Sequence, residues 1–254
     1  MGETLLLVFF LLLAPQTSSR NPTLEIRVPV VTNDPETVPL VAGGEATAVC
    51  AVTAVGIESE YELKGKLTNA SPKPILAFEA VVDLDLGYAA GVRSVEHFDS
   101  FFSGDLLMPG SSTDIRIGRA KGVIPWDGRE HPANINDIPP PKNPHAVVRV
   151  MYVQFADGST FGKSGWGDAL PVQRKSLVSI INRLLLANDD ENDKAFSLTI
   201  EGELNQPNLS QDSLLFLSEL RDRLRQKGRH DAAQYLQDLL RNIPKYDGQL
   251  NLGK

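Results

Sequence analysis

The stretch that decides the fold reads VVRVMYVQF at residues 147–155, followed by ADGS at 156–159 and TFG at 160–162. The first segment is rich in β-branched and aromatic residues, which are typical of a strand. Asp157-Gly158 between two strand patterns predicts a hairpin, because a type I′ turn needs positive φ at both central positions. We therefore predict two antiparallel strands joined by a type I′ turn.

Similar strand patterns recur upstream of this hairpin, with turn residues between them. They cover residues 46–55, 61–69, 75–86 and 113–117. Short strands with no helix among them predict a mainly β fold, an antiparallel β-sandwich over residues 46–170. Residues 20–45 start with alternating sequence and then carry several prolines and Gly43-Gly44, so they predict an extended N-terminal segment with an edge strand.

An insertion at residues 119–146 interrupts the regular spacing of the strands. It is rich in proline and contains Trp126 and His131, and it ends beside His145. A loop longer than about 12–15 residues inside a compact domain is often functional. We expect an ordered insertion at one end of the sandwich, held in place by Trp126.

A C-terminal α-helical extension follows the hairpin. Residues 172–187 have apolar side chains at steps of three and four, which predicts a helix. Phe196, Leu198 and Ile200 alternate with polar residues, so we expect residues 171–209 to hold one helix and one late strand packed on the sandwich. Residues 210–244 predict a helical hairpin broken at Gly228, and residues 245–254 a polar tail.

One segment resembles a known kind of module. It runs from KGKLTNAS at residues 64–71 through a long alternating strand to LMPG at 107–110. This order of strands and turns is similar to that of extracytoplasmic immunoglobulin-like and FxLYD-type modules. The resemblance implies an immunoglobulin-like β-sandwich with a binding role. It covers residues 61–117, and neither the insertion nor the helices belong to it.

Residues 1–19 predict a secretory signal peptide. An unbroken apolar run at residues 5–13 is followed by Pro15 and small residues, the pattern of a processed leader. A membrane span needs about 20 apolar residues, so no stable membrane anchor is expected. The leader departs from the usual pattern because residues 1–4, which precede the apolar run, contain no Lys or Arg. We expect cleavage before Arg20 and a secreted or periplasmic protein.

The charge and the cysteine content exclude several classes of function. The net charge is −7, and an acidic chain repels the phosphates of nucleic acids. The single Cys50 cannot form an intrachain disulfide, and it lies in an apolar segment typical of a buried residue. The sequence has no phosphate-binding loop and no dinucleotide fingerprint, so no cofactor is predicted.

Candidate catalytic and metal sites are weak in this sequence. Asp83 and Asp85 share a strand face, but such pairs usually lie on the solvated side of a sheet. The four histidines lack the short spacing of a metal site, so no metal is predicted. His131 and His145 remain candidates because the insertion could bring them together with Glu130 or Asp137.

Binding residues are easier to propose than catalytic ones. Trp126 and Trp166 could stack on a saccharide or anchor a protein partner, and His131 and His145 could join them. The first hypothesis is therefore an exported, non-enzymatic binding or structural protein. The alternative is a hydrolase of envelope or extracellular polymers that uses acids and histidines of the 119–146 insertion. A third hypothesis is a homodimer formed through the helical hairpin.

Two glycosylation sequons accompany these features. Asn69-Ala-Ser71 and Asn208-Leu-Ser210 both match the acceptor triplet. Their use depends on whether the chain enters a eukaryotic secretory pathway, and the sequence alone leaves this open.

Overall fold

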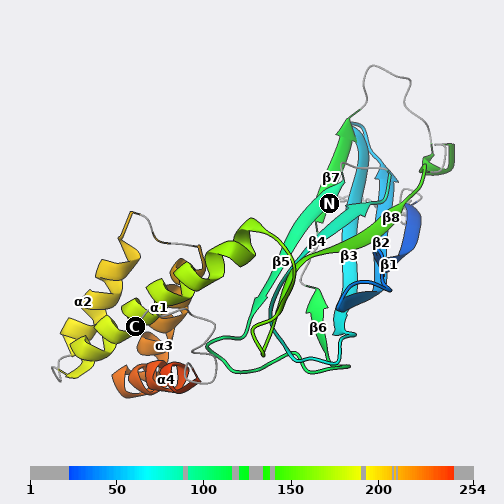
Figure 1. Ribbon diagram of the computed structural model, residues 1–254. Coiled ribbons are helices and arrows are strands. Elements are labelled where there is room, and N and C mark those ends of the chain that lie inside the picture. Colours follow the sequence, from blue (N-terminus) through cyan, green and yellow to red (C-terminus); the bar gives the residue numbers. More distant parts are fainter. Residues whose placement is uncertain are drawn as a thin grey trace, which may run out of the picture.

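The computed structural model describes residues 23–87, 91–115, 120–125, 134–137, 141–189, 193–207, 209 and 211–242. Within these residues a large sheet lies beside a bundle of helices (Figure 1). The strands are β1 Thr23–Thr32, β2 Leu40–Val52, β3 Gly56–Asn69, β4 Ile75–Asp85, β5 Val92–Asp99, β6 Ser112–Ile115, β7 Ala120–Pro125, β8 His145–Phe155 and β9 Thr160–Gly162. The helices are α1 Gly165–Asp189, α2 Asp193–Leu204, α3 Gln211–Lys227 and α4 Arg229–Asn242, with a short 3₁₀ turn η1 at Ile135–Asp137.

Strand β1 connects the two halves of the sheet. It pairs antiparallel with β2 from Thr23 to Pro29, and then parallel with β8 from Val30 to Thr32. Pro29 has no backbone N–H to donate and stands where the pairing changes partner. The prediction of an edge strand in this segment is wrong, because β1 lies between β8 and β2 in the strand order β5-β4-β8-β1-β2-β3-β6.

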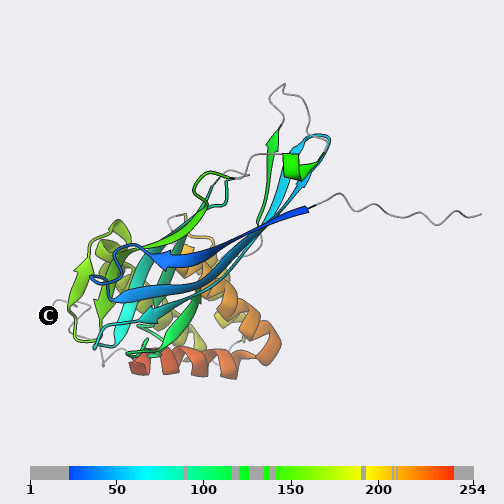
Figure 2. The same ribbon diagram turned by 90° about the vertical axis from the view of Figure 1, so that its right-hand side faces the viewer.

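This topology corrects the predicted fold class. The nine strands of the described chain form one mixed sheet that is nearly closed, like a barrel, rather than an antiparallel sandwich (Figure 2). The immunoglobulin-like architecture implied by the resemblance is therefore contradicted. Alternating sequence identifies which side chains face a core, but it does not identify the neighbouring strand. The parallel pairing of β1 with β8 joins segments far apart in the sequence and has no local signal.

One apolar core fills the inside of the curved sheet. Its fully buried members in strands come from β2, β3, β4 and β8. They include Leu40, Leu67, Ile75, Val82 and Val148. Ile135 of η1 is also fully buried in this core. The insertion is thus anchored by Ile135, and its first residues form β7 against β3. Trp126, the residue expected to hold the insertion, lies outside the described residues.

The β8–β9 hairpin is confirmed, but its predicted turn type is wrong. The backbone N–H of Gly158 donates to the carbonyl of Phe155 over 3.0 Å, and that of Phe155 donates to Ser159 over 2.9 Å. Gly158 has φ of 85°, whereas Asp157 does not have a positive φ. Only one central residue is therefore left-handed, which fits a longer loop than the two-residue type I′ turn. Asp157 instead accepts the Ser159 N–H through its side chain.

The late strand expected around Phe196 is a helix, α2. Phe196 and Ile200 are fully buried, whereas Leu198 is 60% exposed. Residues four apart lie on one face of a strand and also on one face of a helix. The residue between them distinguishes the two structures, because a strand would bury residue 198 with Phe196 and Ile200 and a helix does not. Leu198 is apolar although it faces solvent, so this single position made the sequence resemble a strand.

The helical hairpin of α3 and α4 is confirmed, and all four helices share a core of their own. Gly228 separates the two helices with φ of 86°. The buried members of the helical core include Ile181, Leu184, Phe196, Ile200, Leu217, Leu220 and Leu236. The C-terminal part is thus a four-helix bundle that starts at Gly165 and packs on the sheet through Leu170 and Trp166 of α1. None of the described helices has the length and hydrophobicity needed to cross a bilayer.

Asn69 joins two turns at one end of the sheet. Its side chain is 1% exposed, and Nδ2 donates to the carbonyls of Lys73 and Leu107, each over 2.8 Å. Its Oδ1 accepts from the N–H and the hydroxyl of Ser71. A glycan on Nδ2 would replace one of these bonds and would need buried space. Asn69 is therefore a structural residue, while the second sequon, at Asn208, lies outside the described residues.

We predict that Asn69→Ala lowers the free energy of unfolding by about 3 kcal/mol, because the substitution removes the two bonds that its side chain donates to Lys73 and Leu107 and the two that it accepts from Ser71. Chemical denaturation monitored by circular dichroism measures the change. Asn205→Ala is the matched control, since Asn205 is exposed and donates only to the carbonyl of Glu201 at a helix end. Equal effects of the two substitutions would contradict the structural role of Asn69.

Candidate functional site

A pocket of about 250 Å³ lies where the end of β5 meets the helical bundle. Its walls come from β5 and the turn after it, from one face of α1, and from the start of α3. The lining residues are His97, Asp99, Phe102, Trp166, Gln173, Arg174, Leu177 and Ser213. Segments distant in the sequence therefore build this pocket together, at the junction of the two cores.

The register of the sheet prepares the floor beneath α1. On β4, Ala77 lies opposite Asp99 of β5 on one side and opposite Gln154 of β8 on the other. Residues in register on neighbouring strands present their side chains to the same face. The small side chain of Ala77 leaves room between the two polar groups. A long cation from the helix can therefore bind both of them at once.

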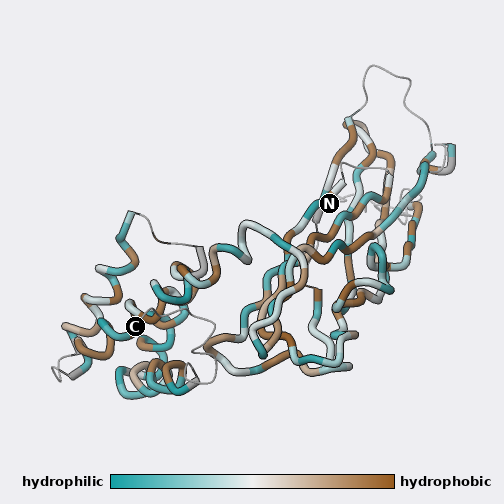
Figure 3. Tube along the Cα trace, in the orientation of Figure 1, coloured by the Kyte–Doolittle hydropathy of each residue, from teal (hydrophilic) through white to brown (hydrophobic). Residues whose placement is uncertain are grey.

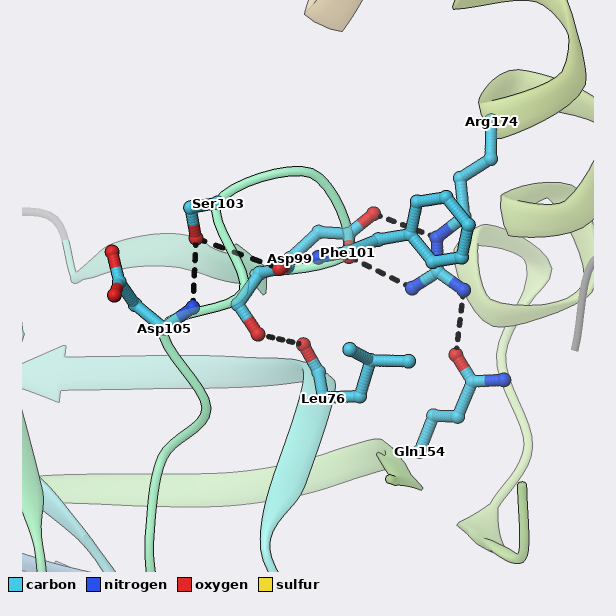
Figure 4. A network of polar contacts seen from close by, with 8 residues as sticks. Leu76, Asp99, Phe101, Ser103, Asp105, Gln154 and Arg174 are labelled. Carbon is cyan, nitrogen blue, oxygen red and sulfur yellow. Dashed lines mark hydrogen bonds and ion pairs between the residues drawn. The ribbon is translucent and has the colours of Figure 1, made fainter. Parts of the chain in front are cut away.

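Arg174 of α1 occupies that space (Figure 4). Its Nε and Nη2 donate to the two carboxylate oxygens of Asp99 over 2.9 and 2.8 Å, and its Nη1 donates to Oε1 of Gln154 over 2.8 Å. The ring of Phe101 lies 4.6 Å from the guanidinium carbon. Arg174 is 2% exposed and the Asp99 side chain is 24% exposed, so the bidentate pair is closed to water on the side of the arginine. It is a charged contact that fixes the bundle against the sheet.

Several hydrogen bonds of ordinary length hold the turn that carries Asp99. Both the N–H and the hydroxyl of Ser100 donate to the carbonyl of Leu76 over 3.0 Å, and the N–H of Asp105 donates to the hydroxyl of Ser103 (Figure 4). The N–H of Phe101 donates to Asp99 over 3.0 Å. The carboxylate is therefore oriented from both its own turn and the helix.

The next row of the same face builds an aromatic wall. Glu79 lies opposite His97 on one side and Tyr152 on the other. Trp166 covers this row: its ring stacks on His97 with centroids 4.5 Å apart and planes 5° apart, and it meets Tyr152 edge-on at 6.3 Å. Burial raises the pKa of the Tyr152 hydroxyl, which therefore stays neutral at physiological pH. Its ring serves as an apolar support for Trp166.

The first turn of α1 is shaped to place Trp166 there. The Ser164 hydroxyl accepts the N–H of Gly167 over 3.0 Å, which caps the helix, and it donates to Glu79 over 2.7 Å. A Cβ on Gly167 would lie 2.5 Å from the ring of Tyr152. A glycine is therefore needed at this position for the helix to lie directly on that ring. The cap at Ser164 and the glycine at position 167 together fix the position of Trp166.

Two polar atoms in the side chains that line the pocket have no hydrogen-bond partner. They are Nε1 of Trp166 and Oε1 of Gln173, and both are shielded from bulk water. The two residues are seven positions apart on α1 and share one helix face. A buried polar atom without a partner costs about 1–3 kcal/mol, and native proteins contain few of them. Both atoms are closed off from the pocket itself, and the described residues hold two more atoms of this kind, in Tyr61 and Arg221.

The predicted binding residues do not come together as a group. Trp166 lies in the pocket wall, but His145 is exposed at the opposite end of β8 from Gln154, with Nδ1 3.0 Å from the carbonyl of Asn143. Trp126 and His131 lie outside the described residues. The partner of Trp166 is His97, which the sequence did not single out. No strand was predicted around residue 97, and nothing in the local sequence distinguishes His97 from the other three histidines.

Arg174 was also missed, although the sequence carried a signal for it. It stands among the apolar positions of α1, between Leu170 and Leu177. A charged residue on the buried face of a helix requires a partner. That partner, Asp99, comes from another part of the chain. The requirement for a partner could therefore be predicted from the sequence, whereas the identity of the partner could not.

The other candidate residues have structural partners. Asp83 forms ion pairs with Arg93 and Arg149 on the outer face of the sheet. Cys50 is buried, and burial raises the pKa of its thiol to about 11, so it is protonated at physiological pH. Over the described ranges, no group of three or more His, Cys, Asp or Glu side chains is placed to hold a metal ion.

Comparisons with family models, with curated proteins and with solved structures find no match to this chain. The sequence likeness to FxLYD-type modules therefore stays a prediction, without the sandwich that it implied. The site has to be interpreted from its own geometry.

We predict that Arg174→Met lowers the free energy of unfolding by about 3 kcal/mol, because it leaves Asp99 and Gln154 without their buried donor. The control is Arg241→Met, which breaks an exposed pair with Asp238 and should cost less than about 0.5 kcal/mol. Urea denaturation measures both. An effect of Arg174→Met no larger than that of the control would show that the pair does not hold the bundle on the sheet.

Proposed function

We propose that this chain is an exported, non-enzymatic binding protein whose ligand occupies the pocket between β5 and α1. The observation that carries the proposal is a pocket of about 250 Å³ at the junction of the two cores, whose walls combine apolar and aromatic side chains with a few polar ones. A ligand in this pocket would contact the sheet and the helical bundle at the same time. The pocket side chains would then be arranged for binding rather than for packing alone.

The composition and the rigidity of the walls support this proposal. Ligand pockets combine apolar and aromatic surface with a few fixed polar groups. Here Phe102, Leu177 and the Trp166–His97 stack supply the apolar surface. The ion pair of Arg174 with Asp99 holds the helix against the sheet, so the pocket is preformed. Binding to a preformed pocket loses little conformational entropy.

The proposed location and partners follow from the sequence. Export is supported by the short apolar leader at residues 5–13. The ligand would belong to a saccharide or to a protein, since both present neutral polar groups beside apolar surface. A second copy of the chain at the α3–α4 hairpin remains a separate prediction. The hydrolase alternative stays a second proposal: Asp137 and His145 are both exposed, and its other residues, Glu130 and His131, lie outside the described residues.

Affinity selection tests this function by comparing the native protein with a variant whose pocket is filled by a larger side chain. The purified protein is equilibrated with a mixed library of small saccharides, amides, acids and amines, and retained compounds are identified by mass spectrometry. We expect compounds retained by the native protein to be lost in Gln173→Trp, because the larger side chain occupies the pocket. Leu186→Trp is the matched control, since Leu186 is 68% exposed on the same helix. Retention that is equal in native protein and Gln173→Trp would contradict the proposal.

A further inference from the structure

Strand β5 ends the described sheet and has an open edge. Among the described strands only β4 pairs with it, and Figure 1 shows β5 at the margin of the sheet on the side of the helices. Val95 is 50% exposed and the His97 side chain is 40% exposed, so solvent reaches this strand. β5 is eight residues long and contains no proline. It therefore lacks two of the devices that keep a further strand from pairing with an edge.

The hydrogen bonds to β4 determine which backbone groups of β5 lie at this edge. The register, continued by one residue, sets Ser100 opposite Leu76, and the Ser100 N–H donates to the Leu76 carbonyl over 3.0 Å. In an antiparallel ladder such bonded pairs recur at every second residue, so Ser94, Glu96 and Phe98 bond to β4. The residues whose N–H and carbonyl groups point away from β4 are the alternate ones, Arg93, Val95, His97 and Asp99.

This open edge leads to the pocket. Side chains alternate between the two faces of a strand with the same period as the backbone groups, so the four residues with outward groups share one face. The last two of them, His97 and Asp99, line the pocket together with Trp166. Residues directly opposite each other in a ladder place their side chains on the same face. A strand added at this edge would therefore place a side chain beside His97, at the pocket.

We propose that β5 binds an extended polypeptide segment as an added antiparallel strand with one apolar side chain in the pocket, an inference that rests on the proposed binding role of this pocket. A polypeptide backbone supplies carbonyl and N–H groups at the spacing of a strand, which a saccharide does not. Phe102, Leu177 and Trp166 offer the side chain an apolar surface. Backbone bonds would supply affinity, and the pocket would select the side chain.

The charges on β5 favour a basic segment over a second copy of this chain. β5 carries one basic residue, Arg93, against the two acids Glu96 and Asp99, and the whole chain has a net charge of −7. A lysine opposite Glu96 would form a favourable cross-strand pair. Two copies of β5 paired symmetrically about Glu96 would instead set two carboxylates opposite each other. The expected segment therefore has a basic residue between two apolar ones.

A synthetic peptide tests the added strand. The end-blocked sequence Thr-Val-Leu-Lys-Leu-Thr-Glu would place its leucines opposite His97 and Val95 and its lysine opposite Glu96. N-methylation removes an N–H, which matters only where that group points at β5. We expect methyl groups on the two leucines to weaken binding about a hundredfold, about tenfold for each, and methyl groups on the lysine and the second threonine to change it less than about twofold. Isothermal titration calorimetry with the purified protein measures these affinities.

Two further measurements locate the contact on β5. In amide hydrogen exchange we expect Val95 and His97 to exchange faster than Glu96 and Phe98 in the free protein, and to slow about tenfold or more when the peptide is bound. Val95→Pro removes an outward N–H and none of the bonds to β4, so it should weaken binding about tenfold. Val95→Thr is the matched control and should bind as the native protein does. Melting temperatures establish that both variants are folded.

Several results would overturn the inference: equal weakening by the two sets of methyl groups, unchanged exchange at Val95, or no binding of the peptide. Protection of Val95 without peptide in a self-associated protein would assign the edge to a second copy and overturn it as well. Peptide affinity that is unchanged in Gln173→Trp would contradict the placement of a side chain in the pocket. The library selection decides the proposed function separately, because compounds lost only in Gln173→Trp would support the pocket even if the strand is not added.

Discussion

Arg174 carries a full positive charge into a place where water does not reach, and the junction of the two parts of the molecule is built around that charge. A buried charge is tolerated only where its partners are complete and correctly placed. Asp99 and Gln154 meet this condition because they occupy the same row of the sheet, with Ala77 between them. Moving the helix would separate Arg174 from both. The position of α1 is therefore fixed by electrostatics as well as by apolar contacts.

The pocket follows from this constraint. The row that contains Ala77 anchors the helix, and the adjacent row, which contains Glu79, supports Trp166 through His97 and Tyr152. Because the helix is fixed at Arg174, its neighbouring turns hold Trp166 and Gln173 over the same face. The mixed sheet brings β5, β4 and β8 side by side, which lets three strands contribute to one site. The fold therefore builds one pocket from the end of β5, the turn after it, one face of α1 and the start of α3.

The sequence predicts the local elements of this structure better than their arrangement. Strand β8 and the hairpin at Gly158 could be predicted because β-branched runs and Asp-Gly turns act locally. The α3–α4 hairpin was predicted for the same reason, from apolar spacing and Gly228. The parallel pairing of β1 with β8 was not predictable, since nothing in Val30–Thr32 specifies a strand so distant in the chain. Of the site, Trp166 was found by residue type, whereas Asp99 and Gln154 become functional neighbours only through the register on β4.

The central claim is that the ion pair between buried Arg174 and Asp99 sets the position of the helical bundle relative to the sheet. Double electron–electron resonance measures that position directly, as the distance between two spin labels. The labels are attached at Val95→Cys on β5 and Leu186→Cys on α1, both at exposed positions. In protein with Arg174 intact we predict a single narrow distribution of distances, and in the same protein with Arg174→Met a broadened one. Identical narrow distributions in both proteins would contradict the claim, as would a broad distribution while Arg174 is present.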